Sequence, residues 1–88
     1  MKRIKSVVAG GKRCRVEWKP LRKDWGLASG GLIEMDSRID DTFTAAEILL
    51  HEMIHIQCPD MSEEKVEQMA RELATAMKRA GLLDEDEQ

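Results

Sequence analysis

Two histidines and a glutamate stand together in the segment His51-Glu52-Met53-Ile54-His55, which has the pattern H-E-x-x-H. An α-helix turns by about 100° per residue, so residues four apart project from one face and His51 and His55 can reach the same ion. Glu52 lies beside them, where a carboxylate can take a proton from a zinc-bound water. The pattern predicts a zinc site in which both histidines bind the metal and Glu52 is the general base. The competing interpretation is a helix that carries two histidines without a metal.

The third metal ligand must be Asp, Glu or Cys, because a catalytic zinc takes three protein ligands and a water and the chain has only two histidines. A second helix, expected after the motif, offers Glu63, Glu64 and Glu67. Glu64 points farthest from the apolar stripe of that helix, and we favour Glu67, with Glu63 as its close rival. Glu63 and Glu64 are also explained as first-turn acids that the helix dipole favours. Cys58 ranks third, because ligands seven residues apart spread over about 10 Å of one helix.

The residues around the motif predict the helix that carries it. They are apolar on nearly every side, which is typical of a central helix covered by other elements. Residues 40–44 offer several N-caps, and Thr44 with Glu47 has the spacing of a capping box. Glu47 also stands one turn before His51, whose ring it could orient instead. Pro59 ends the helix.

A second helix begins at Asp60 or Ser62 and runs to about Ala80, where Gly81 is the C-cap. Its apolar residues recur at helical spacing and form one stripe, which we expect to pack on the motif helix. The members of this stripe are Val66, Met69, Ala70, Leu73 and Met77.

Three strands are expected before the helices. Residues 4–8 and 13–18 flank Gly10-Gly11 and are typical of a β-hairpin. Residues 21–30 read as a connection, and residues 32–36 as a third strand and a candidate edge of the sheet. The predicted fold class is therefore α+β: a small three-stranded sheet packed on two helices, with the metal between the helices near the third strand.

The length of 88 residues predicts one domain spanning 1–88, with a β-rich part at 1–36, two helices within 42–81 and an acidic tail at 82–88. Two cysteines are too few for a disulfide framework, and the N-terminus lacks the apolar region of a signal peptide, so a cytoplasmic location is expected. No apolar run approaches the roughly 18 residues of a membrane span, and no membrane association is expected.

Charge is unevenly distributed along the chain. Residues 1–30 hold nine basic and two acidic residues, whereas residues 31–88 hold five and fifteen. We interpret the basic side chains as the exposed face of the sheet rather than as a surface for nucleic acid, because no aromatic residues are interleaved with them as stacking platforms.

The segment from Thr44 to Ala74, with its motif and second helix, resembles small zinc metallopeptidases encoded by phages and prophages, which look like minimal gluzincins. The wider group includes regulatory proteases that cleave repressors of mobile elements. It pairs the H-E-x-x-H helix with a glutamate on the next helix, often as E-x-x-A, and Glu67-Gln68-Met69-Ala70 matches that setting. The resemblance covers about residues 31–80 and implies that residues 31–36 lie along the cleft. The chain departs from larger gluzincins in lacking a further His or Tyr near the metal and a C-terminal lobe.

The predicted function is zinc-dependent hydrolysis of peptide bonds. Zinc would be bound by His51, His55 and Glu67, and Glu52 would act as general base before delivering the proton to the leaving amine. Residues 32–36 would hold the peptide or protein substrate by β-addition. The alternative is a metal-stabilised binding module of a phage or its host without efficient proteolysis. An open coordination position distinguishes the two, because structural zinc sites are closed by four protein ligands.

Overall fold

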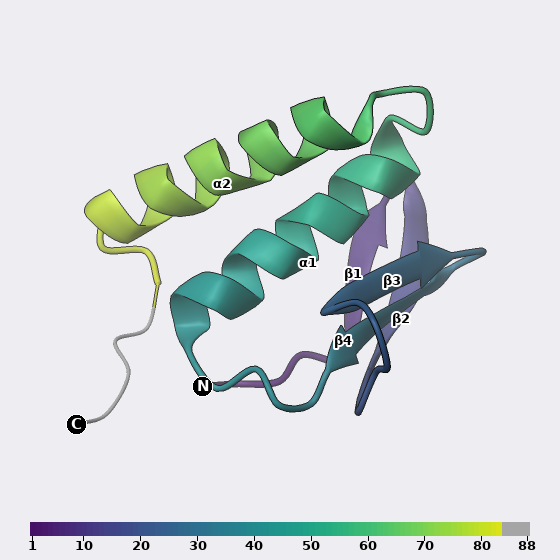
Figure 1. Cartoon of the computed structure of the whole chain (residues 1–88), viewed down its shortest axis with the longest axis horizontal. Helices are drawn as coiled ribbons and strands as arrows, with labels where there is room; N and C mark the ends of the chain where they lie inside the picture. The colour runs from purple at the N-terminus through teal and green to yellow at the C-terminus, as the bar shows by residue number, and fades with distance from the viewer. Residues whose placement is uncertain (84–88) are drawn as a thin grey trace.

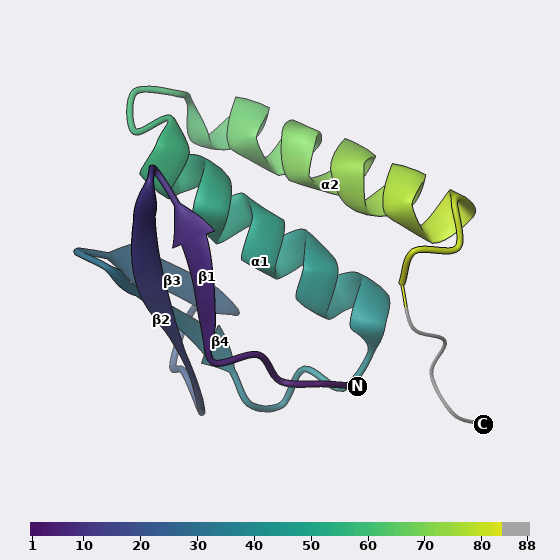
Figure 2. The same ribbon diagram turned by 180° about the vertical axis from the view of Figure 1, so that it is seen from behind.

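The structure is a computed structural model that describes residues 1–83, so the predicted acidic tail lies almost entirely outside the described residues. Helix α1 crosses one face of a β-sheet, and α2 packs on the side of α1 that faces away from the sheet (Figures 1 and 2). This arrangement confirms the α+β class, but the sheet has four strands and not three. The elements are β1 (Ser6–Ala9), β2 (Lys12–Lys19), β3 (Gly26–Ser29), β4 (Leu32–Asp36), α1 (Thr42–Gln57) and α2 (Glu63–Arg79).

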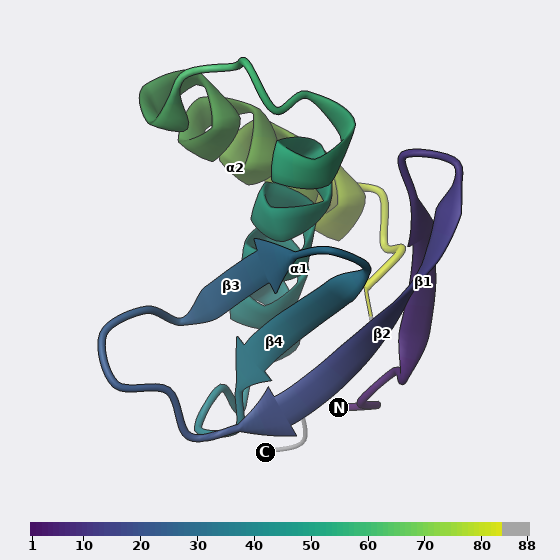
Figure 3. The same cartoon turned by 90° about the vertical axis from the view of Figure 1, so that its right-hand side faces the viewer.

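The sheet consists of two antiparallel hairpins, β1–β2 and β3–β4, which are joined by parallel pairing of β2 with β4. Each hairpin turns through a pair of glycines with positive φ, namely Gly10 at 61° and Gly11 at 75°, and Gly30 at 45° and Gly31 at 85°. A two-residue hairpin loop of this kind needs positive φ at both positions, which glycine adopts without steric cost. The strand order is β1-β2-β4-β3, so β1 and β3 are the two edges (Figure 3).

Strand β3 was not predicted from the sequence, since residues 21–30 were expected to form a connection. Glycine, alanine and serine make up three of its four residues and have little preference for strands, so its local sequence is a weak signal. The tight Gly30-Gly31 turn brings it back along β4, and pairing with β4 provides the stability that local preference lacks. Because β4 has neighbours on both sides, the expectation that residues 32–36 form an edge is wrong.

The open edge of β3 presents the backbone groups of alternate residues. The carbonyl of Trp25 accepts a hydrogen bond of 2.9 Å from the amide of Asp36, so residue 25 points its backbone groups toward β4. In a strand, the N–H and C=O groups of successive residues point to opposite sides. Residues 27 and 29 therefore also face β4, whereas the backbone groups of Gly26 and Ala28 point to the open edge.

The two faces of β3 differ in what they meet. Gly26 pairs with Met35 and Ala28 with Ile33, and both partners are buried in the core against α1. Since directly opposite residues share a face, Gly26 and Ala28 also face α1. Leu27 lies on the opposite, outer face of the sheet.

The core has two parts, one between the sheet and α1 and one between the helices. In the second part Val66, Ala70 and Ala74 of α2 are fully buried, whereas Leu73 is 45% exposed. The predicted stripe is therefore correct at Val66 and Ala70 and wrong at Leu73, because the buried face is centred near Ala70 and extends to Ala74. The first part is formed by Val16, Ile33, Met35 and Ile39.

The helix starts agree only in part with the predicted caps. Asp41 is the N-cap of α1, and its carboxylate accepts a hydrogen bond of 2.8 Å from the amide of Thr44. Thr44 is therefore inside the helix, and the predicted capping box with Glu47 is wrong. Glu47 instead accepts a hydrogen bond of 2.9 Å from Arg71 of α2. Ser62 caps α2, as one of the two predicted candidates.

A buried carboxylate fixes the segment that leads into β3. Asp36 is fully buried and accepts hydrogen bonds from the amides of Leu21 and Arg38 and from the Arg38 guanidinium. These bonds, above all those from the guanidinium, hold the pKa of the Asp36 carboxyl well below its usual range. The Arg38 guanidinium also lies 5.3 Å from the centre of the Trp25 ring. Asp36 thus ties residues 21–25 to the end of β4.

The basic residues of the N-terminal third occupy exposed positions, in agreement with their interpretation as a solvated surface of the sheet. They include Lys12, Arg13, Arg15 and Lys19 of β2. Within residues 1–83 no helix is long and apolar enough to cross a membrane.

Candidate metal centre

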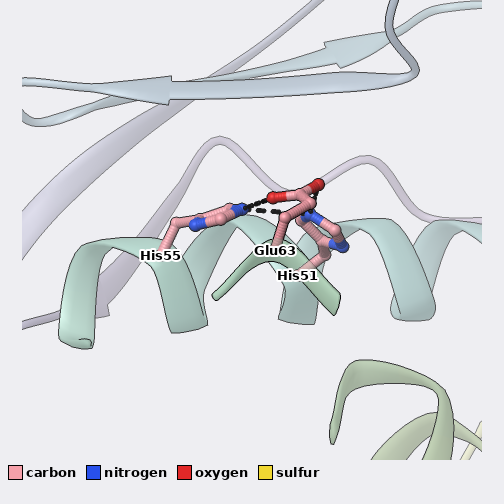
Figure 4. A group of neighbouring side chains, drawn as sticks. All are labelled: His51, His55 and Glu63. Carbon is pink, nitrogen blue, oxygen red and sulfur yellow. Dashed lines mark hydrogen bonds and ion pairs between the residues drawn. The ribbon is translucent and has the colours of Figure 1, made fainter. Parts of the chain in front are cut away.

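His51 and His55 lie one turn apart on α1 and point their rings toward a common point (Figure 4). Their Nε2 atoms are 3.1 Å apart. Glu63, the first residue of α2, reaches both rings: Oε2 is 3.0 Å from Nε2 of His51, and Oε1 is 2.7 Å from Nε2 of His55. One donor atom from each residue lies within 4.8 Å of the others, so this group can hold a metal ion. Two imidazoles and a carboxylate suit a divalent first-row transition metal.

Glu63, and not the favoured Glu67, meets the histidines. Glu67 was preferred because it matches the E-x-x-A pattern. On a helical projection at about 100° per residue, Glu63 lies about 20° from Ala70, the centre of the buried face of α2, whereas Glu67 lies about 60° from it. Glu63 also directly follows the turn between the helices, which places it near His55. Glu67 lines the same groove outside the converging group, and the structure favours Glu63 as third donor.

The two other candidate ligands lie elsewhere. The backbone N–H of Cys58 closes the end of α1 by donating to the carbonyl of Ile54, and its thiol packs against the cluster between the helices. Cys58 is thus a half-buried thiol at the end of α1 and lies outside the converging group. Glu64 is exposed and stands outside the converging group, as its position on the helical projection predicts.

Glu52 is buried beside the histidines, with only 7% of its surface exposed. Burial raises the pKa of the Glu52 carboxyl above its ordinary value, and the charges of Glu63 and Asp24 act in the same direction, whereas His51 and His55 oppose the shift. A raised pKa suits a group that must both take and return a proton near neutral pH.

Strand β3 passes directly over the Glu52 carboxylate, and Gly26 makes this approach possible. A Cβ atom at Gly26 would lie 3.1 Å from Oε2 of Glu52 and 2.7 Å from Cγ2 of Ile48. The second distance is far inside van der Waals contact, so any side chain would push β3 away from α1. The role of Gly26 was not predicted, because nothing in the local sequence reveals which helix residue will face a glycine.

A groove of about 660 Å³ opens above these residues. One face of α1, from Thr44 to His55, forms its floor, α2 forms one wall, and β3 with residues 23–25 forms the other. The side chain of Glu63 is 67% exposed, so the converging group is open to the groove.

A second hollow of about 580 Å³ begins on the other side of His55. It is lined by both Gly-Gly turns and by the end of α1, and it shares Ala28 and His55 with the first groove. Space therefore continues along β3 on both sides of the metal-binding group.

A scan against protein-family models and searches of curated proteins and of solved structures find no match for the chain.

Proposed function

We propose that the chain is a zinc-dependent peptidase of the zincin type, in which His51, His55 and Glu63 hold zinc and Glu52 is the general base. The observation that carries the proposal is the convergence of three metal donors, at the open side of a groove, next to a buried glutamate that does not belong to the group. The sequence resemblance to phage-encoded metallopeptidases supports the same interpretation.

The donor group fits zinc in type and in size. A tetrahedral zinc with bonds of about 2.0–2.1 Å keeps neighbouring donors about 3.3 Å apart. The donors lie 2.7 to 3.1 Å apart, so rotations that move each by roughly a few tenths of an ångström are sufficient. Among the described residues three side chains converge, which is the number typical of catalytic sites that keep one position for water. Bound zinc would supply a Lewis acid and lower the pKa of that water.

Glu52 would carry the proton through the reaction. Its carboxylate would take a proton from the attacking water as the oxygen bonds to the peptide carbon. It would then deliver that proton to the amide nitrogen as the C–N bond breaks, so that a carboxylic acid and an amine leave. None of residues 1–83 donates a hydrogen bond to this carboxylate, which leaves its oxygens available to water in the groove.

The substrate backbone would pair with β3. This corrects the sequence-based expectation that residues 32–36 bind the peptide, because β4 is covered by β2 and β3. Gly26 and Ala28 point their backbone groups to the open edge, and β3 borders the groove along its length. An extended peptide added to this edge would lie along the groove and pass the metal.

The proposal is tested by zinc content and peptide cleavage measured on the same samples. Wild-type protein loaded with zinc should retain about one ion per chain and cleave members of a peptide library. Glu52→Gln should retain zinc and fold but lose at least about 100-fold in cleavage rate, the usual loss of a general base. Zinc retention without cleavage by the wild type would contradict the proposal and favour the metal-stabilised binding module.

The third ligand is tested by two matched substitutions. Glu63→Gln should weaken zinc affinity by more than the roughly 10–100-fold typical of residues that only orient a ligand. Glu67→Gln is the control, because it removes a carboxylate from the same helix and groove without touching the converging group. A larger loss from Glu67→Gln would return the ligand role to Glu67.

A further inference from the structure

Two large apolar side chains are exposed beside the open edge of the sheet. Trp25, just before β3, is 53% exposed, and Leu27 within β3 is 43% exposed. They stand two residues apart and thus share the outer face, opposite to the face of Gly26 and Ala28 that meets α1. Both border the groove that holds the metal donors. Their neighbour on the outer face is polar, since Leu27 pairs with Glu34, which is bound to Lys19.

A strand added to β3 would bring one of its side chains into contact with Leu27. Because Gly26 and Ala28 make the outward hydrogen bonds, Leu27 would occupy a non-hydrogen-bonded position in an antiparallel pair, where opposite side chains approach most closely. The residue opposite Leu27 shares its face and points away from the metal. Its neighbours on either side point toward α1 and the groove.

We propose that Leu27, together with Trp25, selects peptide substrates that carry an apolar side chain at the position opposite Leu27. This inference rests on the proposed function and names the substrate class of the same site: extended peptides whose outward-facing residue is apolar. A leucine or an aromatic residue there would cover apolar surface of Leu27 and Trp25 that is otherwise in contact with water. An apolar pair across two strands improves binding by up to about fivefold relative to alanine.

The peptide substrate is a better occupant of this edge than a second copy of the chain. Strand β3 has four residues, and only two of them point backbone groups outward. So few hydrogen bonds do not hold the β3 edges of two folded copies together stably. A single extended peptide also gains contacts in the two hollows on either side of His55, both of which border β3.

The test is a binding measurement that does not require cleavage. Zinc-loaded Glu52→Gln is titrated with a positional library of acetylated and amidated octapeptides, in which each position is in turn Leu, Ser, Asp or Lys. The same titration is repeated with Leu27→Lys and Leu27→Glu in the Glu52→Gln protein, at low salt. Val8→Lys is the matched control, because Val8 is 66% exposed on β1 at the opposite edge of the sheet. Hydrolysis by the zinc-loaded wild type is measured separately.

We expect one peptide position at which Leu is preferred several-fold over Ser, Asp and Lys. Leu27→Lys should turn this preference toward Asp, and Leu27→Glu should turn it toward Lys, whereas Val8→Lys should change nothing. Preferences that do not follow the charge at residue 27, or no peptide binding at all, would overturn the inference. The inference would also be overturned if the wild type self-associates and Leu27→Lys abolishes that association, since the edge would then bind a second copy of the chain. Peptide binding that follows residue 27, combined with a wild type that does not hydrolyse peptides, would refute the proposed function and leave the edge assignment intact.

Discussion

Replacing Gly26 with alanine separates the role of β3 from that of the metal ligands. A Cβ at this position would lie 2.7 Å from Cγ2 of Ile48, whereas carbon atoms in ordinary contact are about 3.5–4.0 Å apart. The strand must therefore move away from α1 by up to roughly 1 Å, or Ile48 must leave its place in the core. The φ angle of Gly26 is not positive, so the backbone itself accepts alanine.

The size of the effect follows from these contacts. Overpacking of this kind costs about 1–3 kcal/mol, and the lower entropy of the unfolded alanine chain recovers about 0.4–1 kcal/mol. The net loss in free energy of unfolding is then at most about 2.6 kcal/mol, which lowers the Tm of a domain of this size by up to about 20 °C. A displacement of about 1 Å at the reacting groups can reduce the rate about 100-fold.

The assay compares three quantities in Gly26→Ala and the wild type: Tm, zinc affinity and the rate of peptide cleavage. Zinc affinity should be unchanged, because His51, His55 and Glu63 lie on the helices. The control is Gly81→Ala, where φ is 72° and a Cβ would meet nothing within 4 Å, so that it strains the backbone far from the groove. It should lower Tm and leave the rate unchanged. If Gly26→Ala cleaves peptide at the wild-type rate, or if it loses zinc, then β3 does not position the substrate over Glu52.

Three further predictions concern stability and metal binding. Zinc at 100 times its dissociation constant should stabilise the fold by about 2.7 kcal/mol and raise Tm by roughly 10–20 °C in thermal unfolding, and a chelator should reverse the increase. Ala70→Leu should weaken zinc affinity as well as lowering Tm, because a larger side chain between the helices moves Glu63 from the histidines, whereas Ala76→Leu at an exposed position should do neither. Asp36→Asn should lower Tm at neutral pH, since the folded-state pKa of Asp36 lies below its unfolded value of about 3.9 and its stabilisation is present above that value. The difference in Tm between this variant and the wild type should shrink as the pH falls below about 4, and a constant difference would contradict the assignment.

The sequence alone predicted the features that depend on residues near one another in the chain. The spacing of His51 and His55 on one helical face requires only the regular geometry of a helix, and Pro59 and Ser62 mark where one helix ends and the next begins. The Gly10-Gly11 turn likewise predicted the first hairpin. These features belong to segments whose local preferences agree with the fold.

The tertiary structure decided how those segments meet. Whether Glu63 or Glu67 reaches the histidines depends on how α2 is rotated against α1, and the small residues Ala70 and Ala74 set that rotation through close packing. Strand β3 forms because β4 offers it a partner, although its own residues have little preference for a strand. The order of the strands then makes β3 the edge above Glu52. Contacts between residues distant in the chain arise only when the whole fold is packed, and no local pattern in the sequence encodes which groups they bring together.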